Sequence, residues 1–313
     1  MILITGSTGY VGSHISEFFD QKKIEYIGID NLSYSYMQNV RNNKKHFKID
    51  ISDSKKICKI FKKFNINLVI HAAASSYVLE AEKNKKRYFI NNVKKTKKFI
   101  NLCKLKKIEN FIFLSSSNVY EEKNIFSEQD KIWSKNYYGK NKIIIENFLK
   151  KKKFKSLIVL RLFNVIGLYN KFFKPFKFKD KKYQRIMFQI REKLTNNKEV
   201  QLRYFKINKK RVFPSRDFID VKIICNIIEK IIKILNKKNI GTKFFNIGSG
   251  MSTPIDKIIN NFEKLTKKKI KINYKEIDKK ELIRTRANIS KIKSFLNYKI
   301  NFNLIKSLKS YIN

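Results

Sequence analysis

The first residues of the chain carry the feature that most constrains its fold: a strand-like run, a glycine-rich turn and a helix-length segment follow one another without a break. The apolar run Met1–Thr5 leads into Gly6-Ser7-Thr8-Gly9-Tyr10-Val11-Gly12, and residues 11–21 have the length of a helix. In such a unit the first glycine permits the tight turn, the second lets the backbone approach a pyrophosphate, and the third lets helix and strand pack closely. The N–H groups of the helix N-terminus then bind phosphate. We therefore predict a dinucleotide-binding turn at residues 6–12.

A carboxylate follows the second apolar run. Asp30 comes directly after Tyr26–Ile29, 18 residues beyond Gly12. An acidic side chain at this place binds both ribose hydroxyls and would repel a 2′-phosphate, so the pattern favours NAD over NADP. The alternative is an aspartate that caps a turn before Asn31.

Short apolar runs alternate with helix-length segments through the N-terminal half. Further runs are Leu68–Ile70, Phe111–Leu114 and Leu157–Leu160, and the helix-length segments are 54–64, 87–105 and 138–152. This rhythm predicts an α/β fold with a Rossmann-type, doubly wound parallel sheet. The rhythm becomes irregular after residue 168.

We expect two domains from this change in rhythm. Residues 1–168 would form the NAD-binding Rossmann domain, and residues 169–313 a smaller C-terminal α/β substrate-binding region. Strand candidates lie near 200–205 and 243–247. A stretch of about 212–247 is expected to return to the Rossmann sheet.

The net charge is the main argument for a different class of protein. Lys and Arg total 71 against 25 acidic residues, a formal charge of +46, which could attract nucleic acid or an anionic membrane. However, the lysines are spread along the whole chain beside abundant Asn, Ile, Phe and Tyr, and no nucleic-acid-binding motif accompanies them. We interpret the charge as biased composition and expect no nucleic-acid partner. The basic-aromatic segment 171–182 is interpreted as a loop bordering an anionic ligand, with base stacking or membrane contact as alternatives.

Cysteine and histidine patterns argue against other classes. Three cysteines without a CxxC motif indicate reduced thiols in a cytoplasmic protein, and the three histidines have no metal-ligand spacing, so we expect no metal. No apolar run approaches the ~20 residues that span a membrane, so we expect no membrane insertion.

A tyrosine and a lysine lie four residues apart at Tyr138 and Lys142. On a helix such residues share a face. Tyrosine, with a pKa of about 10, is a poor base at neutral pH, but a nearby ammonium and a positive nicotinamide favour the phenolate. The pair therefore predicts a general base. Tyr137 is the other candidate for the base, but the residue four positions after it is Asn141, not a lysine. The alternative is that a YxxxK motif occurs by chance in a chain rich in Tyr and Lys.

With these motifs the chain resembles the extended short-chain dehydrogenases/reductases of the NAD-dependent epimerase/dehydratase family, and within them the UDP-galactose 4-epimerases. The resemblance runs nearly the full length and includes Asp30-Asn31-Leu32, Asp50-Ile51, His71-Ala72-Ala73-Ala74 and Asn92-Val93. It implies NAD as cofactor, bound by Gly6, Gly9, Tyr10, Val11, Gly12, Asp30, Asn31, Asp50, Ile51, Ala72, Ala73, Asn92, Tyr138 and Lys142.

The stretch FIFLSSSNVY ends a predicted strand in three serines, at the edge where such sheets bind ligands. By the resemblance the catalytic serine falls on Ser116, which would hydrogen-bond the sugar hydroxyl and relay its proton to Tyr138. Ser117 is the alternate, and a serine-rich turn that caps the strand is the alternative reading. Related dehydratases and decarboxylases carry acids where this chain has Ser117 and Asn118, which favours oxidation and re-reduction at one carbon.

Two segments of the C-terminal half resemble the family's nucleotide-sugar site. In Arg161-Leu162-Phe163-Asn164, Asn164 would contact the sugar diphosphate. In Arg216-Asp217-Phe218, Arg216 would bind a phosphate through its planar fork, with a structural Arg–Asp pair as the alternative. The connection from Leu202 to Arg216 has the length typical of these epimerases, but Tyr204 and Lys206 stand where glycine and acid are usual.

The last matched segment is Ala287-Asn288-Ile289-Ser290-Lys291. By the resemblance a second phosphate arginine should fall near Asp278, and Lys279, Lys280 or Arg284 are the candidates to replace it. The family's size gate for the sugar C2 substituent falls on Thr285. A small residue there implies that UDP-N-acetylhexosamines are accepted.

The resemblance thus implies an NAD-dependent 4-epimerase of a UDP-hexose, either UDP-glucose/UDP-galactose or UDP-GlcNAc/UDP-GalNAc, working through a transient 4-keto sugar. Its substrate contacts would be Ser116, Ser117, Tyr138, Asn164, Arg216 and Thr285. It also implies a homodimer packed through helices near 87–105 and 138–152. The alternatives are another nucleotide-sugar epimerase or a reductase on the same scaffold, and a non-catalytic basic Rossmann protein that binds nucleic acid.

Overall fold

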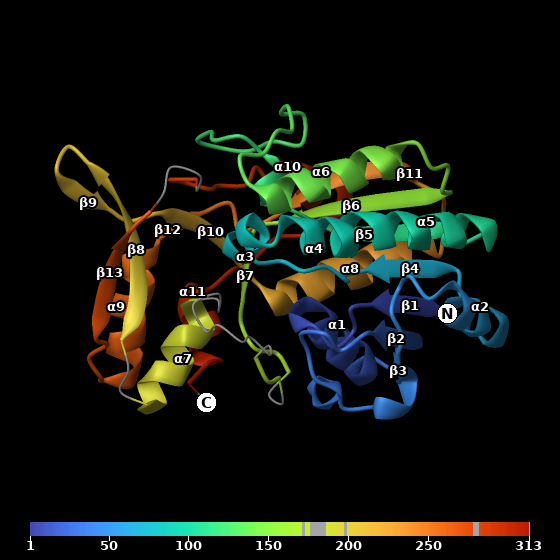
Figure 1. Ribbon diagram of the computed structural model, residues 1–313, viewed down its shortest axis with the longest axis horizontal. Coiled ribbons are helices and arrows are strands. Elements are labelled where there is room, and N and C mark those ends of the chain that lie inside the picture. The colour runs from blue at the N-terminus through green and yellow to red at the C-terminus, as the bar shows by residue number, and fades with distance from the viewer. Residues whose placement is uncertain (171–172, 176–185, 197–198, 278–281, 313) are drawn as a thin grey trace.

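A parallel sheet forms the centre of the computed structural model, which describes residues 1–170, 173–175, 186–196, 199–277 and 282–312 (Figure 1). Its strands lie in the order β11-β6-β5-β4-β1-β2-β3, and all neighbours pair in parallel. The strands are β1 (Ile2–Thr5), β2 (Tyr26–Asp30), β3 (His46–Lys48), β4 (Leu68–His71), β5 (Asn110–Ser116), β6 (Ser156–Leu162) and β11 (Gly241–Ile247). The strand order reverses between β1 and β4, which confirms the predicted doubly wound Rossmann sheet.

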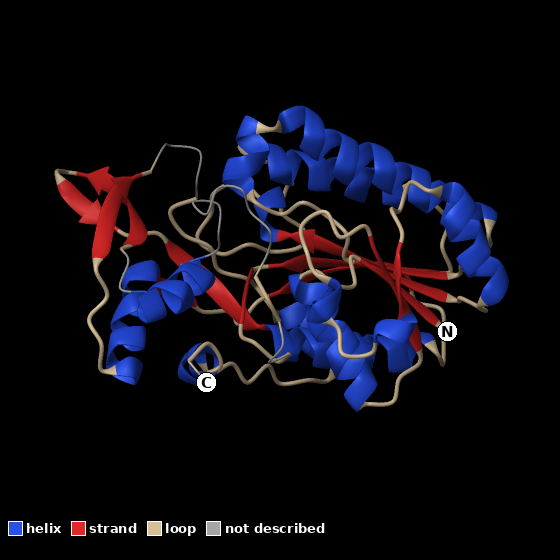
Figure 2. Cartoon of the chain, turned by 60° about the horizontal axis from the view of Figure 1, so that its bottom comes forward, coloured by secondary structure: helices blue, strands red, loops and turns tan. Residues whose placement is uncertain are grey.

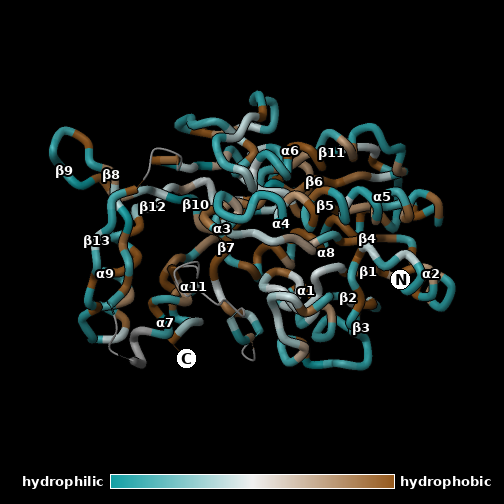
Figure 3. Tube along the Cα trace, in the orientation of Figure 1, coloured by the Kyte–Doolittle hydropathy of each residue, from teal (hydrophilic) through white to brown (hydrophobic). Residues whose placement is uncertain are grey.

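Helices cover both faces of this sheet (Figure 2). One face carries α2 (Ser54–Lys63), α5 (Thr96–Leu105) and α6 (Tyr137–Lys150), and the other carries α1 (Tyr10–Gln21), α8 (Val221–Leu235) and α10 (Ser290–Leu296). Side chains alternate between two cores along each strand: Ile2 and Ile4 pack with α1 and α8, whereas Leu3 packs with α2 and α5. Both faces are buried, which explains why the strands read as continuous apolar runs. Figure 3 shows the hydrophobic segments gathered along the sheet and α8.

The helix predicted at 87–105 contains an irregular turn. It runs as α4 (Lys85–Phe89), a π-helical turn at Ile90–Lys95 and α5, following α3 (Val78–Lys83). A π-helical turn holds one more residue than an α-helical turn and often lies at a functional site. Short 3₁₀ turns occur at Met37–Asn39, Asn43–Lys45 and Ser117–Val119.

The remaining elements form a second part at the left of Figure 1. Two three-stranded sheets have the orders β12-β10-β7 and β13-β8-β9. The elements are β7 (Asn164–Ile166), α7 (Ile186–Asn196), β8 (Val200–Ile207), β9 (Lys210–Val212), β10 (Ser215–Asp220), β12 (Ser252–Pro254), α9 (Ile255–Thr266), β13 (Ile272–Glu276) and α11 (Leu304–Lys309). Within the stretch 212–247, β11 lies in the main sheet, whereas β10 pairs with β7 and β12.

A tyrosine clasp, made of Tyr10, Gly167 and Tyr311, joins the glycine turn to the second part. The Tyr10 hydroxyl donates to the Gly167 carbonyl at 2.6 Å, and the Gly167 N–H donates to the Tyr311 hydroxyl at 2.9 Å. The two hydroxyl oxygens are 3.3 Å apart. Phe173 packs edge-on against Tyr10; the rest of the basic-aromatic segment 171–182, apart from Lys174 and Pro175, lies outside the described residues.

Candidate active site

The glycine turn is packed so closely that two of its glycines cannot carry a side chain. Gly6 has φ +67°, and a Cβ there would lie 2.7 Å from Ala73 Cα, in the loop after β4. A Cβ on Gly12 would lie 2.1 Å from the Gly6 carbonyl oxygen. At Gly9 the nearest atom would be 3.2 Å away, so packing within the chain constrains Gly9 least. The loops after β1 and β4 therefore meet where the strand order reverses, the place at which such sheets bind ligands.

Asp30 holds this turn in place. Its carboxylate accepts hydrogen bonds from Thr8 N at 3.2 Å, Leu32 N at 2.8 Å and Ser35 Oγ at 3.3 Å. A cavity of about 90 Å³ lies alongside, lined by Asp30, Asn31, Ile51, Ala72, Ala73, Gly6 and Gly9, among others. These predicted cofactor residues are thus brought to one cavity.

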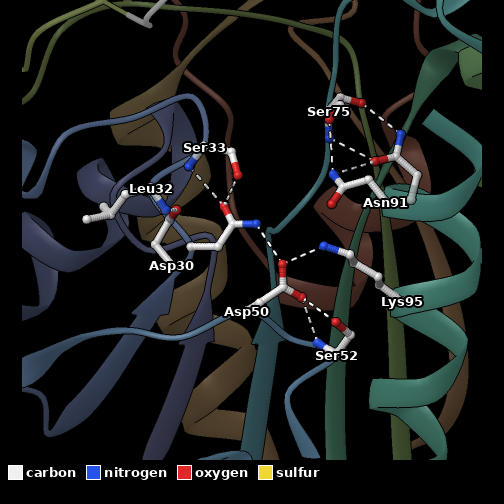
Figure 4. Close-up of polar contacts among 10 residues, drawn as sticks. Asp30, Leu32, Ser33, Asp50, Ser52, Ser75, Asn91 and Lys95 are labelled. Carbon is white, nitrogen blue, oxygen red and sulfur yellow. Dashed lines mark hydrogen bonds and ion pairs between the residues drawn. The ribbon is translucent and has the colours of Figure 1, made fainter. Parts of the chain in front are cut away.

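Asp50 contacts Asn31 but does not line that cavity, and Figure 4 shows it between Ser52 and Lys95. Its carboxylate accepts from Lys95 Nζ at 2.5 Å, Asn31 Nδ2 at 2.9 Å, and the N–H and hydroxyl of Ser52 at 2.9 and 2.7 Å. Burial alone would raise the pKa of Asp50, but these donors lower it below the ordinary range. The ionised Asp50 thus fixes the amide of Asn31 at the cavity edge.

Asn92 also acts from behind the cavity. Its side chain accepts from Ser75 N and donates to Ser75 O, both at 2.8 Å, and it is buried. Asn91, its neighbour in the π-helical turn, donates to Ser75 Oγ at 3.0 Å and lines the smaller cavity (Figure 4). The irregular turn thereby lets two consecutive amides hold one loop.

A larger cavity of about 380 Å³ brings the predicted catalytic residues to the glycine turn. Its lining includes Ser116, Tyr138, Lys142 and Asn164 together with Gly6, Gly9, Tyr10, Val11, Gly12 and Ala72. Ser116 and Tyr138 are each 7% exposed and Lys142 is 5% exposed.

Lys142 lies under the Tyr138 ring. Its Nζ is 5.8 Å from the ring centroid and donates to the Leu114 carbonyl at 2.7 Å. Burial lowers the pKa of Lys142 to about 7, although Glu146 acts in the opposite direction. A cation so close to Tyr138 is positioned to stabilise a phenolate.

The three serines after β5 have different surroundings. Ser116 Oγ accepts from the backbone N and Nδ2 of Asn118, at 3.2 and 3.1 Å. Ser115 donates to Glu146 at 2.6 Å, while Ser117 lines a third cavity. Ser115 and Ser116 both line the cavity that contains Tyr138, but the Ser115 hydroxyl already donates to Glu146.

A buried ion pair supports this strand from behind. Arg161 Nη2 lies 2.8 Å from Glu146 Oε2, and the two side chains are 3% and 0% exposed. Arg161 also donates to the Tyr120 hydroxyl at 2.8 Å, and Tyr120 donates to Asn246 at 2.6 Å. Arg161 thus joins β5, α6 and β6 below the site.

The third cavity, of about 270 Å³, collects the predicted substrate residues. Ser117, Asn164, Arg216 and Thr285 line it, and it shares Tyr77, Asn118 and Asn164 with the larger cavity. Because the smaller cavity shares Gly6 and Gly9 with the larger one, the three form a continuous cleft. Its ends lie at Asp30 and Arg216.

Residues around Arg216 hold this end of the cleft together. Arg216 Nη1 donates to the carbonyls of Leu282 and Ser215 at 2.7 and 3.0 Å. Asp217, fully buried, accepts from Ser249 N and Oγ, Gly250 N and Ala287 N at 2.7–3.0 Å. Thr285 Oγ1 accepts from Asp217 N at 3.1 Å.

Sequence reasoning missed two residues of this site. A Cβ on Gly139 would lie 2.0 Å from the Asn118 carbonyl oxygen, so this glycine allows α6 to bring Tyr138 against the serine turn. A glycine inside a predicted helix was the available signal. Arg203, on β8, lines the third cavity, and no motif marked it. Among the candidates for the second phosphate cation, Arg284 is exposed, and Lys279 and Lys280 lie outside the described residues.

The described residues offer neither a cluster of metal ligands nor a membrane-spanning helix. They contain no group of three His, Cys, Asp or Glu side chains that could hold a metal ion. None of their helices is long and apolar enough to cross a membrane.

Comparisons with known proteins agree with this geometry. The model of a family described as the NAD dependent epimerase/dehydratase family matches residues 2–248. An uncharacterized protein of Methanocaldococcus jannaschii is 27% identical over 100% of this chain and 95% of its own length. The UDP-glucose 4-epimerase of Haemophilus influenzae is 34% identical over 53% of this chain and 53% of its own length.

Solved structures share the fold. UDP-glucose-4-epimerase from Stenotrophomonas maltophila, with bound NAD and formylated UDP-arabinopyranose, has a TM-score of 0.88 at 20% identity and covers 99% of this chain and 96% of that one. The UDP-Glc/GlcNAc 4-epimerase from Campylobacter jejuni has a TM-score of 0.81 at 24% identity, covering 99% and 97%.

Proposed function

This chain belongs to the NAD dependent epimerase/dehydratase family, and we propose that within it the protein is a UDP-hexose 4-epimerase. One observation carries the proposal: Ser116, Tyr138 and Lys142 line the same cavity as the glycine turn. A cofactor held at the turn can therefore reach a sugar carbon while Tyr138 reaches the hydroxyl on that carbon.

The cleft fits NAD along its length. Asp30 would bind the adenosine ribose, and Gly6 and Gly12 leave the turn without the side chains that would fill it. The N-terminus of α1 would face the pyrophosphate. Lys142 would hold the nicotinamide ribose beside Tyr138.

The chain's own residues would handle the proton. Tyr138, as phenolate, takes the proton of the sugar 4-hydroxyl, through or beside Ser116. When bound beside Tyr138, NAD would supply the hydride acceptor and donor that the reaction at C4 requires. The 4-keto sugar rotates in the cleft and presents its opposite face. Tyr138 then returns the proton to the oxygen on C4. The sugar leaves with inverted C4 and no net oxidation.

The acids around the cavity favour this reaction over dehydration. Among the described residues that line the larger cavity, Glu80 is the only carboxylate. It accepts from Tyr88 at 2.6 Å and pairs with Arg87. Positions 117 and 118 are serine and asparagine, so no acid lies there to remove a second proton or expel water.

Thr285 supports a wider choice of sugar. Its small side chain lines the cavity that contains Arg216, with its hydroxyl turned to Asp217 N. We infer that an N-acetyl group at C2 is accommodated there.

The test is direct turnover. The purified protein is incubated with NAD and either UDP-GlcNAc or UDP-glucose, and the 4-epimer is separated by chromatography. We expect 4-epimer from both sugars without net NADH, and Tyr138→Phe should lower kcat by about 10²–10⁴-fold.

Tyr137→Phe is the matched control, because Tyr137 is the preceding residue of the same helix; it should retain activity. Stoichiometric NADH would instead point to a reductase. Absence of 4-epimer from both sugars would reject the proposal.

We also infer a homodimer that packs through α5 and α6, as the family resemblance implies. Light scattering at micromolar concentration should give twice the chain mass of 37.4 kDa. A monomer under those conditions would contradict this inference.

A further inference from the structure

Two guanidinium groups line the 270 Å³ cavity at the substrate end of the cleft. Arg216 comes from β10 and Arg203 from β8. No aspartate or glutamate occurs among the described residues that line this cavity. A concave surface with two cations and no carboxylate concentrates anions.

The strand fixes the direction of Arg203. Along β8, Val200 and Leu202 are buried in the core with α7 and α9, whereas Gln201 and Arg203 line the cavity. Because successive side chains of a strand point to opposite faces, core packing at Leu202 directs Arg203 to the cavity side. Arg203 is therefore presented by a paired strand between β9 and β13.

The two cations interact. Desolvation lowers the pKa of Arg216 to about 10, and Arg203 acts in the same direction, while Glu122 opposes them. Placing two like charges at one cavity destabilises the empty protein. A ligand with two negative groups removes that repulsion, because each arginine can bind an oxyanion through charge-assisted hydrogen bonds.

We propose that Arg203 is the second phosphate-binding residue of the substrate site, so that Arg203 and Arg216 together hold the two phosphates of a nucleoside diphosphate sugar. The inference rests on the proposed function. The cavity shares Asn118 and Asn164 with the larger one, so a diphosphate held here presents its sugar towards Tyr138. This assigns, from the described residues, the second phosphate cation that the resemblance places near residue 278.

The experiment measures UDP and UMP binding to the NAD-loaded protein by titration calorimetry. Arg203→Gln should weaken UDP binding by about 10- to 100-fold and UMP binding less, so the preference for UDP falls. With UDP-glucose as substrate, KM should rise and kcat at saturation should change little. Arg203→Lys keeps the charge and loses the planar fork, so its UDP affinity should lie between those of the wild type and Arg203→Gln.

Arg211→Gln is the matched control, since it removes the same charge from β9 of the same small sheet, at an exposed position outside the cavity. It should leave both affinities unchanged. Circular dichroism and NAD content check folding; if Arg203→Gln fails to fold, a reduced UDP preference in Arg203→Lys is the required result.

Wild-type affinity for UDP in Arg203→Gln, or in Arg203→Lys where that variant alone folds, overturns the inference. Epimerisation by the wild type would then leave the proposed function standing. A wild type that neither epimerises a UDP-hexose nor binds UDP rejects the function and this inference with it.

Discussion

The two ends of the cleft are built in different ways. The cofactor end depends on backbone contacts, where a Cβ on Gly6 or Gly12 would overlap main-chain atoms of the loops after β1 and β4. The substrate end depends on side chains from separate elements: Asn164 from β7, Arg203 from β8 and Arg216 from β10. Steric contact with the backbone therefore determines which residues can stand at the cofactor end. At the substrate end the residue types are determined by charge and shape.

The largest expected effect separates two glycines of the turn. Gly12→Ala should unfold the turn, because its Cβ would lie 2.1 Å from the Gly6 carbonyl oxygen; we expect a lower Tm even without NAD. Gly9→Ala, with 3.2 Å to the same atom, should retain its Tm and weaken NAD binding alone. Thermal unfolding and NAD titration of both variants measure this, and equal Tm losses would remove the distinction.

Two buried carboxylates should each contribute to the free energy of unfolding. Glu146 pairs with Arg161 under the catalytic strand, and Glu146→Gln should cost about 3–5 kcal/mol because a buried cation loses its partner. Asp217→Asn should cost roughly 1–3 kcal/mol for each backbone N–H that then faces an amide N–H. Urea unfolding measures both.

Glu109→Gln is the control, because the Glu109–Lys155 pair is exposed and should contribute less than about 1 kcal/mol. A loss as large as that of Glu146→Gln would contradict the role of burial.

Burial of Lys142 should make the free energy of unfolding depend on pH. Burial lowers its pKa to about 7 in the fold, against 10.5 for an exposed lysine, so between these pH values the unfolded chain binds a proton that the folded chain lacks. The wild type is therefore destabilised fully below pH 7, and regains this stability as pH rises to about 10.5. Lys142→Met should be more stable than the wild type by a few kcal/mol at pH 7, and should be inactive.

The difference in unfolding free energy between wild type and Lys142→Met should close as pH rises, whereas Lys140→Met, at an exposed position of the same helix, should show no such trend. A pH-independent difference for Lys142→Met would contradict the lowered pKa that burial gives Lys142.

The smallest effect concerns the choice of sugar. Thr285→Tyr should lower kcat/KM for UDP-GlcNAc by about tenfold or more through steric exclusion and affect UDP-glucose less. Thr285→Ser keeps the hydroxyl bonded to Asp217 N and should preserve both activities. Equal losses for both sugars would show that residue 285 does not act as a size gate.

The sequence was enough for the parts of the fold with strong local patterns. The strands from β1 to β6 with continuous apolar runs, and the helices α1, α2 and α6, follow from periodicity and length. Short strands such as β3, β7 and β12 have three residues each, too few to carry a pattern. The π-helical turn escaped prediction because its extra residue is held by Ser75, a tertiary partner.

The site divides in the same way. Tyr138, Lys142 and the glycines belong to motifs with fixed spacing, so their positions along the sequence are enough to identify them. Arg203 could not be predicted, because its position depends on the pairing of β8 with β13, 72 residues away. Asp50 and Asn92 were predicted as cofactor contacts; in the structure they hold Asn31 and Ser75, which lie nearer the cavity. Their direct contact with NAD stays a prediction.

The tyrosine clasp has a consequence for the biosynthesis of the protein. Tyr10 and Tyr311 are 301 positions apart, so the glycine turn leaves the ribosome long before the Tyr311 hydroxyl of the clasp exists. Contacts of such long range form late, because a large loop must first close. Until Tyr311 has been synthesised, the glycine turn therefore relies on its contacts with Asp30 and Gly167.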